Sequence, residues 1–205
     1  MTIRDFLKET ASKAPVPGGG SVSALAGALA AALTEMVANL TIGRKGHEHS
    51  LAEMENILRQ ASLLREKLTQ AVSLDAEAFQ QVMTAQRLPR TTDEEKKSRA
   101  HAMQAALQHA ARVPLEVARD GLNIIAMAQT VVEHGNPNAI TDGAVAAMMA
   151  RTAVLGALYN VEINLCSIKD PAFVSDVAAQ VKKIRSRAFE EEKTLLKRVD
   201  LAIKG

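Results

Sequence analysis

Asp75 is the residue whose type and position most favour acid–base chemistry in this chain. It falls on a stripe of apolar side chains that recur at spacings of three and four, as on the buried face of a helix: Leu64, Leu68, Val72, Phe79 and Val82. Burial disfavours the charged form of a carboxyl and raises its pKa, which suits proton transfer near neutral pH. The alternative is structural, because a carboxylate on an apolar face also caps or braces neighbouring helices.

A second candidate feature is the glycine triplet of Gly18, Gly19 and Gly20, which is followed by Ser21 and a long Ala/Leu-rich segment. Glycines let a backbone approach a ligand closely, and Ser21 or Ser23 can begin a helix. Free N–H groups at such a helix start attract anionic or carbonyl oxygens. The triplet lacks the Gly-Lys-Ser/Thr ending of a phosphate loop and no strand precedes it, so a phosphate-binding loop is not indicated.

Two amides, Asn160 and Asn164, end another stripe at helical spacing. The stripe consists of small residues that let a neighbouring helix approach closely: Gly143, Ala146, Ala150, Ala153 and Ala157. Amides at such positions either bridge helices or bind the hydrogen-bonding edge of a ligand, and bridging is the more common role.

Other polar residues are interpreted as structural. Glu35 shares a helical face with Ser21 and is predicted to be a buried, hydrogen-bonded carboxylate. The single cysteine, Cys166, lies in an apolar helical stretch and is predicted to be an inert buried thiol. The five histidines show no spacing that would supply three or four zinc ligands, so no metal site is predicted.

Long helices must position these residues. Turns rich in glycine, proline and polar residues separate five to six expected helices, at residues 3–12, 20–42, 50–87, 93–134, 142–167 and from 171 nearly to the C-terminus. Thr92 and Glu95 form a capping box at the start of one helix, and Pro114 is expected to kink it. We therefore predict an all-α, single-domain bundle that covers residues 1–205 and packs closely through alanines.

The composition agrees with an all-α protein and disfavours a nucleic-acid-binding or membrane protein. With four Phe, one Tyr and no Trp, the core must depend on small side chains. A net charge of +2 disfavours nucleic-acid binding. Residues 20–42 are long enough to cross a membrane, but Glu35 and Asn39 would be costly in lipid, so a buried helix is expected there. One cysteine and no visible signal peptide indicate a cytoplasmic protein that does not contact a membrane.

Four segments, in order, resemble the cyclodeaminase (C-terminal) domain of the formiminotransferase-cyclodeaminase family. They are PGGGSVSALAGALAAALTEMVANLTIGRK; DAEAF at 75–79; RLP with TTDEEK and the later RVPLEVA; and GNPNAITDGAVAAMMARTAVLGALYNVEINL. Together they reach across most of the chain without an insertion. The resemblance implies an all-helical homodimer that performs folate chemistry without metal and without a cofactor beyond its tetrahydrofolate-derived substrate.

The same resemblance assigns roles to individual residues. It implies that Asp75, in the DAEAF segment, is the catalytic acid/base. The glycine turn and the segment that contains Asn136 and Asp142 are implied elements of the pocket. We expect the glycine turn, Gly18 to Ser21, to hold the pterin ring of the folate together with Asn160 or Asn164.

The basic residues Arg44 and Lys45 have two interpretations. They attract the glutamate tail of the folate, which can be polyglutamylated, or they belong to a solvated loop without a ligand.

Two reactions are expected from the resemblance. A cyclodeaminase converts 5-formiminotetrahydrofolate to 5,10-methenyltetrahydrofolate and releases ammonia. The alternative is a cyclohydrolase, which adds water to the methenyl carbon and opens the ring to 10-formyltetrahydrofolate. A more distant alternative is a folate-binding or assembly module that has no catalytic activity.

Overall fold

The computed structural model describes residues 2–204, which fold into six α-helices and two short 3-10 turns, without a β-strand in that range. The helices are α1 (Ile3–Thr10), α2 (Gly19–Asn39), α3 (Leu51–Arg87), α4 (Asp93–His134), α5 (Ile140–Leu165) and α6 (Pro171–Lys204). The 3-10 turns η1 (Glu48–Ser50) and η2 (Pro137–Ala139) precede α3 and α5. The predicted all-α bundle of five to six helices is confirmed.

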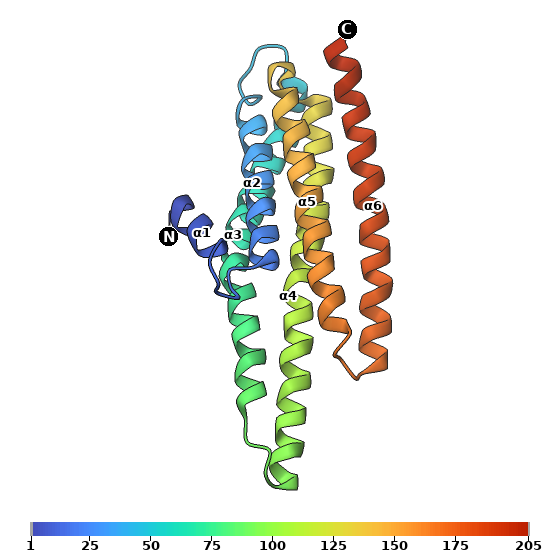
Figure 1. Cartoon of the computed structure of the whole chain (residues 1–205). Helices are drawn as coiled ribbons and strands as arrows, with labels where there is room; N and C mark the ends of the chain where they lie inside the picture. Colours follow the sequence, from blue (N-terminus) through green and yellow to red (C-terminus); the bar gives the residue numbers. More distant parts are fainter. Residues whose placement is uncertain (1, 205) are drawn as a thin grey trace.

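Helices α2 to α5 form the body of the molecule. Figure 1 shows α2, α3, α4 and α5 side by side, with α6 along one side and the short α1 projecting from the other. The lower halves of α3 and α4 extend beyond the start of α2 (Figure 1). The start of α2 therefore lies against the middle of α3, where Asp75 is located.

Alanine and glycine allow α2 and α5 to approach each other closely. Ala24, Ala30 and Ala31 on α2 are fully buried, as are Ala146, Ala150, Ala153 and Ala157 on α5. A Cβ added to Gly156 would overlap the Ser23 hydroxyl, so glycine lets α5 approach α2 with Ser23 in its present position. Close packing through small side chains, predicted from the scarcity of aromatic residues, is confirmed.

Local signals place the helix ends close to their predicted positions. The Thr92 N–H donates to Glu95 Oε2 at 3.0 Å and the Glu95 N–H donates to Thr92 Oγ1 at 3.2 Å, which is the predicted capping box. Pro114 lies inside α4, and the helix continues through it to His134. The first helix ends at Thr10 instead of residue 12, and α5 begins at Ile140 instead of residue 142.

Two segments have the length and apolar character of membrane spans, Gly19–Asn39 and Pro137–Leu165, with mean hydropathies of 1.6 and 1.4. Of the most apolar window in each, 61% and 50% respectively is buried inside the bundle. The helices of these two segments, α2 and α5, pack against each other and against α4. This burial agrees with the interpretation of residues 20–42 as a core helix.

The prediction of a buried thiol is wrong. Cys166 is exposed, because α5 ends at Leu165 and the cysteine is its C-cap residue. Its Sγ lies 3.4 Å from the Glu162 carbonyl oxygen, an ordinary contact at a helix end.

Candidate active site

A cavity of about 300 Å³ lies beside the start of α2. Four parts of the chain enclose it, namely the turn before α2 and the facing sides of α3, α4 and α5. Its lining residues are Pro15, Val16, Gly18, Gly19, Gly20, Asp75, Ala78, Phe79, Val82, Ala110, Asn160, Ile163 and Asn164. The structure thus brings together the glycine triplet, Asp75 and both amides, which are far apart in the sequence.

Asp75 lies against the first turn of α2. The Ser21 hydroxyl is 2.9 Å from Asp75 Oδ2 and 3.0 Å from the Val72 carbonyl oxygen, one turn earlier on α3. A Cβ on Gly20 would overlap Asp75 Oδ1. Glycine is therefore needed at position 20 so that the carboxyl of α3 can reach the start of α2.

The helix start and the carboxyl suit each other electrostatically. Helix α2 has no acidic residue in its first turn and no side-chain cap of its own, since its N-cap residue is Gly18. The partial positive charge at a helix N-terminus favours a nearby anion. Asp75 thus occupies, from another helix, the position that a capping side chain normally fills.

Burial nevertheless raises the pKa of Asp75. Loss of hydration is the largest cause, and hydrogen bonds from the Ser21 hydroxyl and the Ser21 backbone N–H offset part of the increase. Asp75 is the single ionisable side chain among the described residues that line the cavity. A raised pKa makes a half-buried carboxyl a candidate for proton exchange with a ligand.

Both amides line the cavity and also make structural hydrogen bonds. Asn160 Nδ2 donates to the Gly156 carbonyl oxygen at 2.8 Å, while Asn164 Nδ2 donates to the carbonyl oxygens of Asn160 at 2.8 Å and Ala110 at 3.0 Å. Asn164 therefore bridges α5 and α4, as one of its two interpretations predicted. Neither Oδ1 atom accepts a hydrogen bond within residues 2–204, so both remain available to a donor on a ligand.

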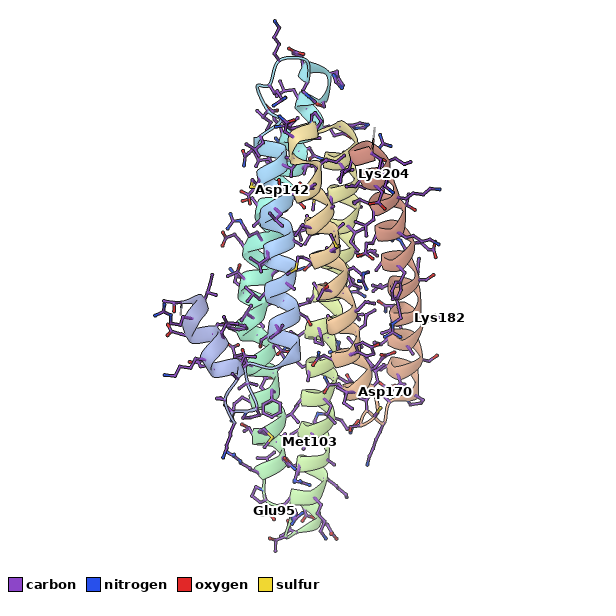
Figure 2. All side chains as sticks on the ribbon, turned by 45° about the horizontal axis from the view of Figure 1, so that its top comes forward. Glu95, Met103, Asp142, Asp170, Lys182 and Lys204 are labelled. Carbon is purple, nitrogen blue, oxygen red and sulfur yellow. The ribbon has the colours of Figure 1, made fainter. Side chains whose placement is uncertain are left out.

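Five other predicted site residues do not line this cavity. One of them, Ser21, is fully buried against α3, next to Asp75 and Val72. Arg44 and Lys45 are exposed in the loop after α2, and the length of α2 separates that loop from the glycine turn by about 30 Å. Asp142 lies near the same end of the bundle (Figure 2). Asn136 is buried there, and its backbone N–H donates to Thr41 Oγ1 at 2.9 Å.

Glu35 has a structural partner. Arg65 Nε on α3 donates to Glu35 Oε2 at 2.8 Å, and the carboxylate side chain is only 20% exposed. The pair joins α2 to α3 about four turns from the cavity. Glu35 is thus a hydrogen-bonded structural group as predicted, although it is half-buried instead of fully buried.

The sequence interpretation missed a second buried carboxylate, Asp120 on α4. Lys67 Nζ lies 3.0 Å from its Oδ1 and 2.8 Å from its Oδ2. Burial is the largest cause that raises the pKa of Asp120, and Lys67 lowers it in part. Asp120 borders a separate cavity of about 250 Å³ between α3 and α4. Its helical spacing from Val117 and Ile124, both buried, is the signal that could have identified it.

The chain is similar to known proteins in sequence. Residues 2–183 match the sequence profile described as Formiminotransferase-cyclodeaminase. The chain is 41% identical over 187 residues to a methenyltetrahydrofolate cyclohydrolase of Methylorubrum extorquens, an alignment that covers 91% of this chain and 90% of that protein. It is also 35% identical to the formimidoyltransferase-cyclodeaminase of Sus scrofa, with 97% of this chain aligned to 37% of that longer protein.

A solved structure shows the same fold. The crystal structure of formiminotetrahydrofolate cyclodeaminase from Thermotoga maritima superposes with a TM-score of 0.89 and 30% sequence identity. The match covers 99% of this chain and 98% of that one. The sequence profile, the relatives and the superposition all show that the chain belongs to the formiminotransferase-cyclodeaminase family of folate one-carbon enzymes.

Proposed function

We propose that the cavity binds a tetrahydrofolate derivative and that Asp75 transfers protons at its one-carbon unit. The observation that carries this proposal is that Asp75 lies against the glycine turn. Among the described residues that line the cavity, it is the one ionisable side chain. Its raised pKa lets the carboxyl act as a base in one step and as an acid in the next.

The other lining groups suit a flat, polar-edged ring. Phe79, Val82 and Ile163 offer apolar surface, and Gly19 and Gly20 leave the backbone accessible. The free Oδ1 atoms of Asn160 and Asn164 can accept hydrogen bonds from the N–H groups of a pterin. The proposal requires no cofactor apart from the folate itself.

We place methenyltetrahydrofolate cyclohydrolysis first, because the 41% identical cyclohydrolase matches this chain over 90% of its own length. Asp75 takes a proton from water as the water oxygen bonds to the cationic methenyl carbon. The carboxylic acid then gives that proton to N5 as the bond between the carbon and N5 breaks. The hydroxyl of the intermediate becomes the formyl carbonyl, and its remaining proton is released to solvent. The product is 10-formyltetrahydrofolate, and the negative charge of Asp75 stabilises the cationic substrate.

Cyclodeamination is the second candidate, favoured by the superposition on the Thermotoga maritima enzyme. N10 of 5-formiminotetrahydrofolate bonds to the carbon of the protonated formimino group (CH=NH2+), and Asp75 removes the N10 proton. The same carboxyl gives the proton to the departing nitrogen, which leaves as ammonia while 5,10-methenyltetrahydrofolate forms. One carboxyl supplies both proton transfers, so the lining that is present suffices for either reaction.

A side-by-side assay of the two substrates tests this proposal. Loss of methenyl absorbance above the uncatalysed rate supports the cyclohydrolase, and its appearance from formiminofolate supports the cyclodeaminase. Binding of tetrahydrofolate without turnover of either substrate would contradict the enzymatic proposal and favour a non-catalytic folate-binding module.

We also propose that the protein is a cytoplasmic homodimer that joins through α2 and α5. Val22, Leu29 and Met36 recur every seven residues on the outer face of α2, and all three are exposed. On the adjacent α5, Tyr159 and Ile163 are each 68% exposed. Exposed apolar side chains on two neighbouring helices are typical of an interface with another chain.

Because Ile163 also lines the cavity, a partner on this face would cover part of the cavity mouth. Leu29→Glu should convert the dimer to a monomer in light scattering. Leu63→Glu, at a 71% exposed leucine on α3, is the matched control and should remain a dimer. A wild-type monomer at micromolar concentration would refute the proposed dimer.

A further inference from the structure

The Ser21 hydroxyl has one proton but two acceptors within hydrogen-bond distance. Its Oγ lies 2.9 Å from Asp75 Oδ2 and 3.0 Å from the Val72 carbonyl oxygen. Ser21 is fully buried, so water does not compete for the hydroxyl. The single proton can point to only one acceptor at a time.

The protonation state of Asp75 determines which acceptor is used. When Asp75 is ionised, a hydrogen bond from Ser21 to the charged Oδ2 is stronger than one to a neutral carbonyl. When Oδ2 carries a proton, Asp75 becomes the donor and Ser21 Oγ the acceptor. The Ser21 proton then points to the Val72 carbonyl oxygen, so all three groups are satisfied in both states.

Val72 can gain or lose this hydrogen bond at little cost. It lies well inside α3, where its carbonyl oxygen accepts the helical N–H from four residues later. A carbonyl oxygen has two lone pairs, and Ser21 uses the second. The hydroxyl can therefore reverse direction without leaving a buried backbone group unpaired.

No charged side chain contributes to the pKa of Asp75 within residues 2–204. Besides burial, only the hydroxyl and backbone N–H of Ser21 affect it. The groups that the neighbouring elements present around the cavity are uncharged: Gly19 and Gly20 on α2, Ala110 on α4, and Asn160 and Asn164 on α5. Ser21 is thus the one side chain positioned to control the protonation of this carboxyl.

We propose that Ser21 is a positioning residue whose reversible hydroxyl holds Asp75 in place in both protonation states. This assigns Ser21 a role different from contact with the pterin. It deepens the proposed function and rests on it, because a carboxyl that acts as base and then as acid in one turnover must be held in the same place throughout. Only a proton moves between the two states, so no reorganisation of the heavy atoms is needed.

The test is a direct titration of Asp75 by NMR of the carboxyl carbon in protein labelled with ¹³C-aspartate, with Asp75→Asn used to assign the resonance. Ser21→Ala removes a hydrogen bond to the charged form, so the pKa of Asp75 should rise. Ser23→Ala is the matched control, because Ser23 is also buried on α2 but donates to the Gly19 carbonyl oxygen at 2.7 Å. It should leave the pKa of Asp75 at its wild-type value.

Kinetics provide a second readout. Ser21→Ala should lower kcat about 10-fold at neutral pH with little change in KM, because hydrogen bonds to charged groups contribute at least that factor. The acid limb of the kcat profile should move to higher pH together with the NMR titration. If Ser21→Ala does not fold, Ser21→Cys keeps the side-chain shape with a weaker donor and should change both readouts in the same directions.

An Asp75 pKa that is unchanged in the folded Ser21 variant would overturn this proposal, whatever the activity. The proposed function fails by a different result, full turnover by Asp75→Asn. The two failures are therefore distinguishable, since the NMR titration does not depend on catalysis.

Discussion

Asp75 and Asp120 are two aspartates on adjacent helices whose pKa values burial raises, yet their partners differ. Asp75 receives a hydrogen bond from the neutral Ser21 hydroxyl and lines the cavity beside the glycine turn. Both carboxylate oxygens of Asp120 form ion-pair contacts with the ammonium group of Lys67, at 3.0 and 2.8 Å. The Ser21 hydroxyl can donate or accept a hydrogen bond, so it suits a carboxyl that gains and loses a proton. The cationic partner favours the ionised form of Asp120, which joins α3 to α4.

The largest expected effect is a loss of kcat when Asp75, but not Asp120, is replaced. Asp75→Asn should reduce kcat by roughly 10²- to 10⁴-fold, the usual contribution of a general acid or base. The amide oxygen can still accept from Ser21, so the thermal unfolding temperature should change little. Asp120→Asn is the control, and its kcat should stay close to wild type in the absorbance assay. Equal losses of kcat in the two variants would contradict a catalytic role for Asp75 alone.

The next largest effect is expected at Gly20, which leaves room for the Asp75 carboxyl at the start of α2. Gly20→Ala places a Cβ onto Asp75 Oδ1 and should displace the carboxyl. We expect destabilisation of about 1–3 kcal/mol, typical of overpacking, and a loss of kcat approaching that of Asp75→Asn.

Gly19→Ala provides the comparison, because its Cβ would lie 3.4 Å from Asn160 Nδ2, an ordinary contact. Urea unfolding and kcat measured on both variants check this pair. If the two alanines had the same effect on kcat, close approach of Asp75 would not explain the glycine at position 20.

A third prediction concerns stability at the other carboxyl. Lys67→Met leaves Asp120 buried without its cation, while the exposed half of Lys67 limits the loss. We expect unfolding to become easier by about 1–2 kcal/mol at pH 7, with kcat per folded molecule unchanged. Urea denaturation measures the first quantity. A large fall in kcat would mean that Asp120 takes part in the reaction.

The smallest effect is the pH dependence of stability. The pKa of Asp75 in the folded state exceeds its ordinary value of 3.8. Between these two pKa values, the folded state therefore holds more protons than the unfolded state. The free energy of unfolding therefore falls as pH rises from 3.8 through the folded pKa. Asp75→Asn should remove this part of the slope, while the part from Asp120 remains. An unchanged slope would contradict the raised pKa of Asp75.

Helical periodicity in the sequence was sufficient to predict the bundle and to identify Asp75. It could not show that Gly20 lies against Asp75, because their contact depends on how two helices cross. The same limit applies to Asp142. The sequence places it at the start of a helix, but it does not show that only the other end of that helix, with Asn160 and Asn164, reaches the cavity. Cys166 was misassigned because an apolar stretch does not show the exact residue at which a helix ends.

The most direct test of the central claim is a single-turnover measurement on wild type and Asp75→Asn, each saturated with 5,10-methenyltetrahydrofolate. Binding of tetrahydrofolate, measured separately by calorimetry, establishes that the variant cavity is intact. We expect similar affinities for the two proteins and a rate of methenyl decay in the variant that is close to the uncatalysed rate. Equal single-turnover rates in the two proteins would show that Asp75 is only the cap of α2.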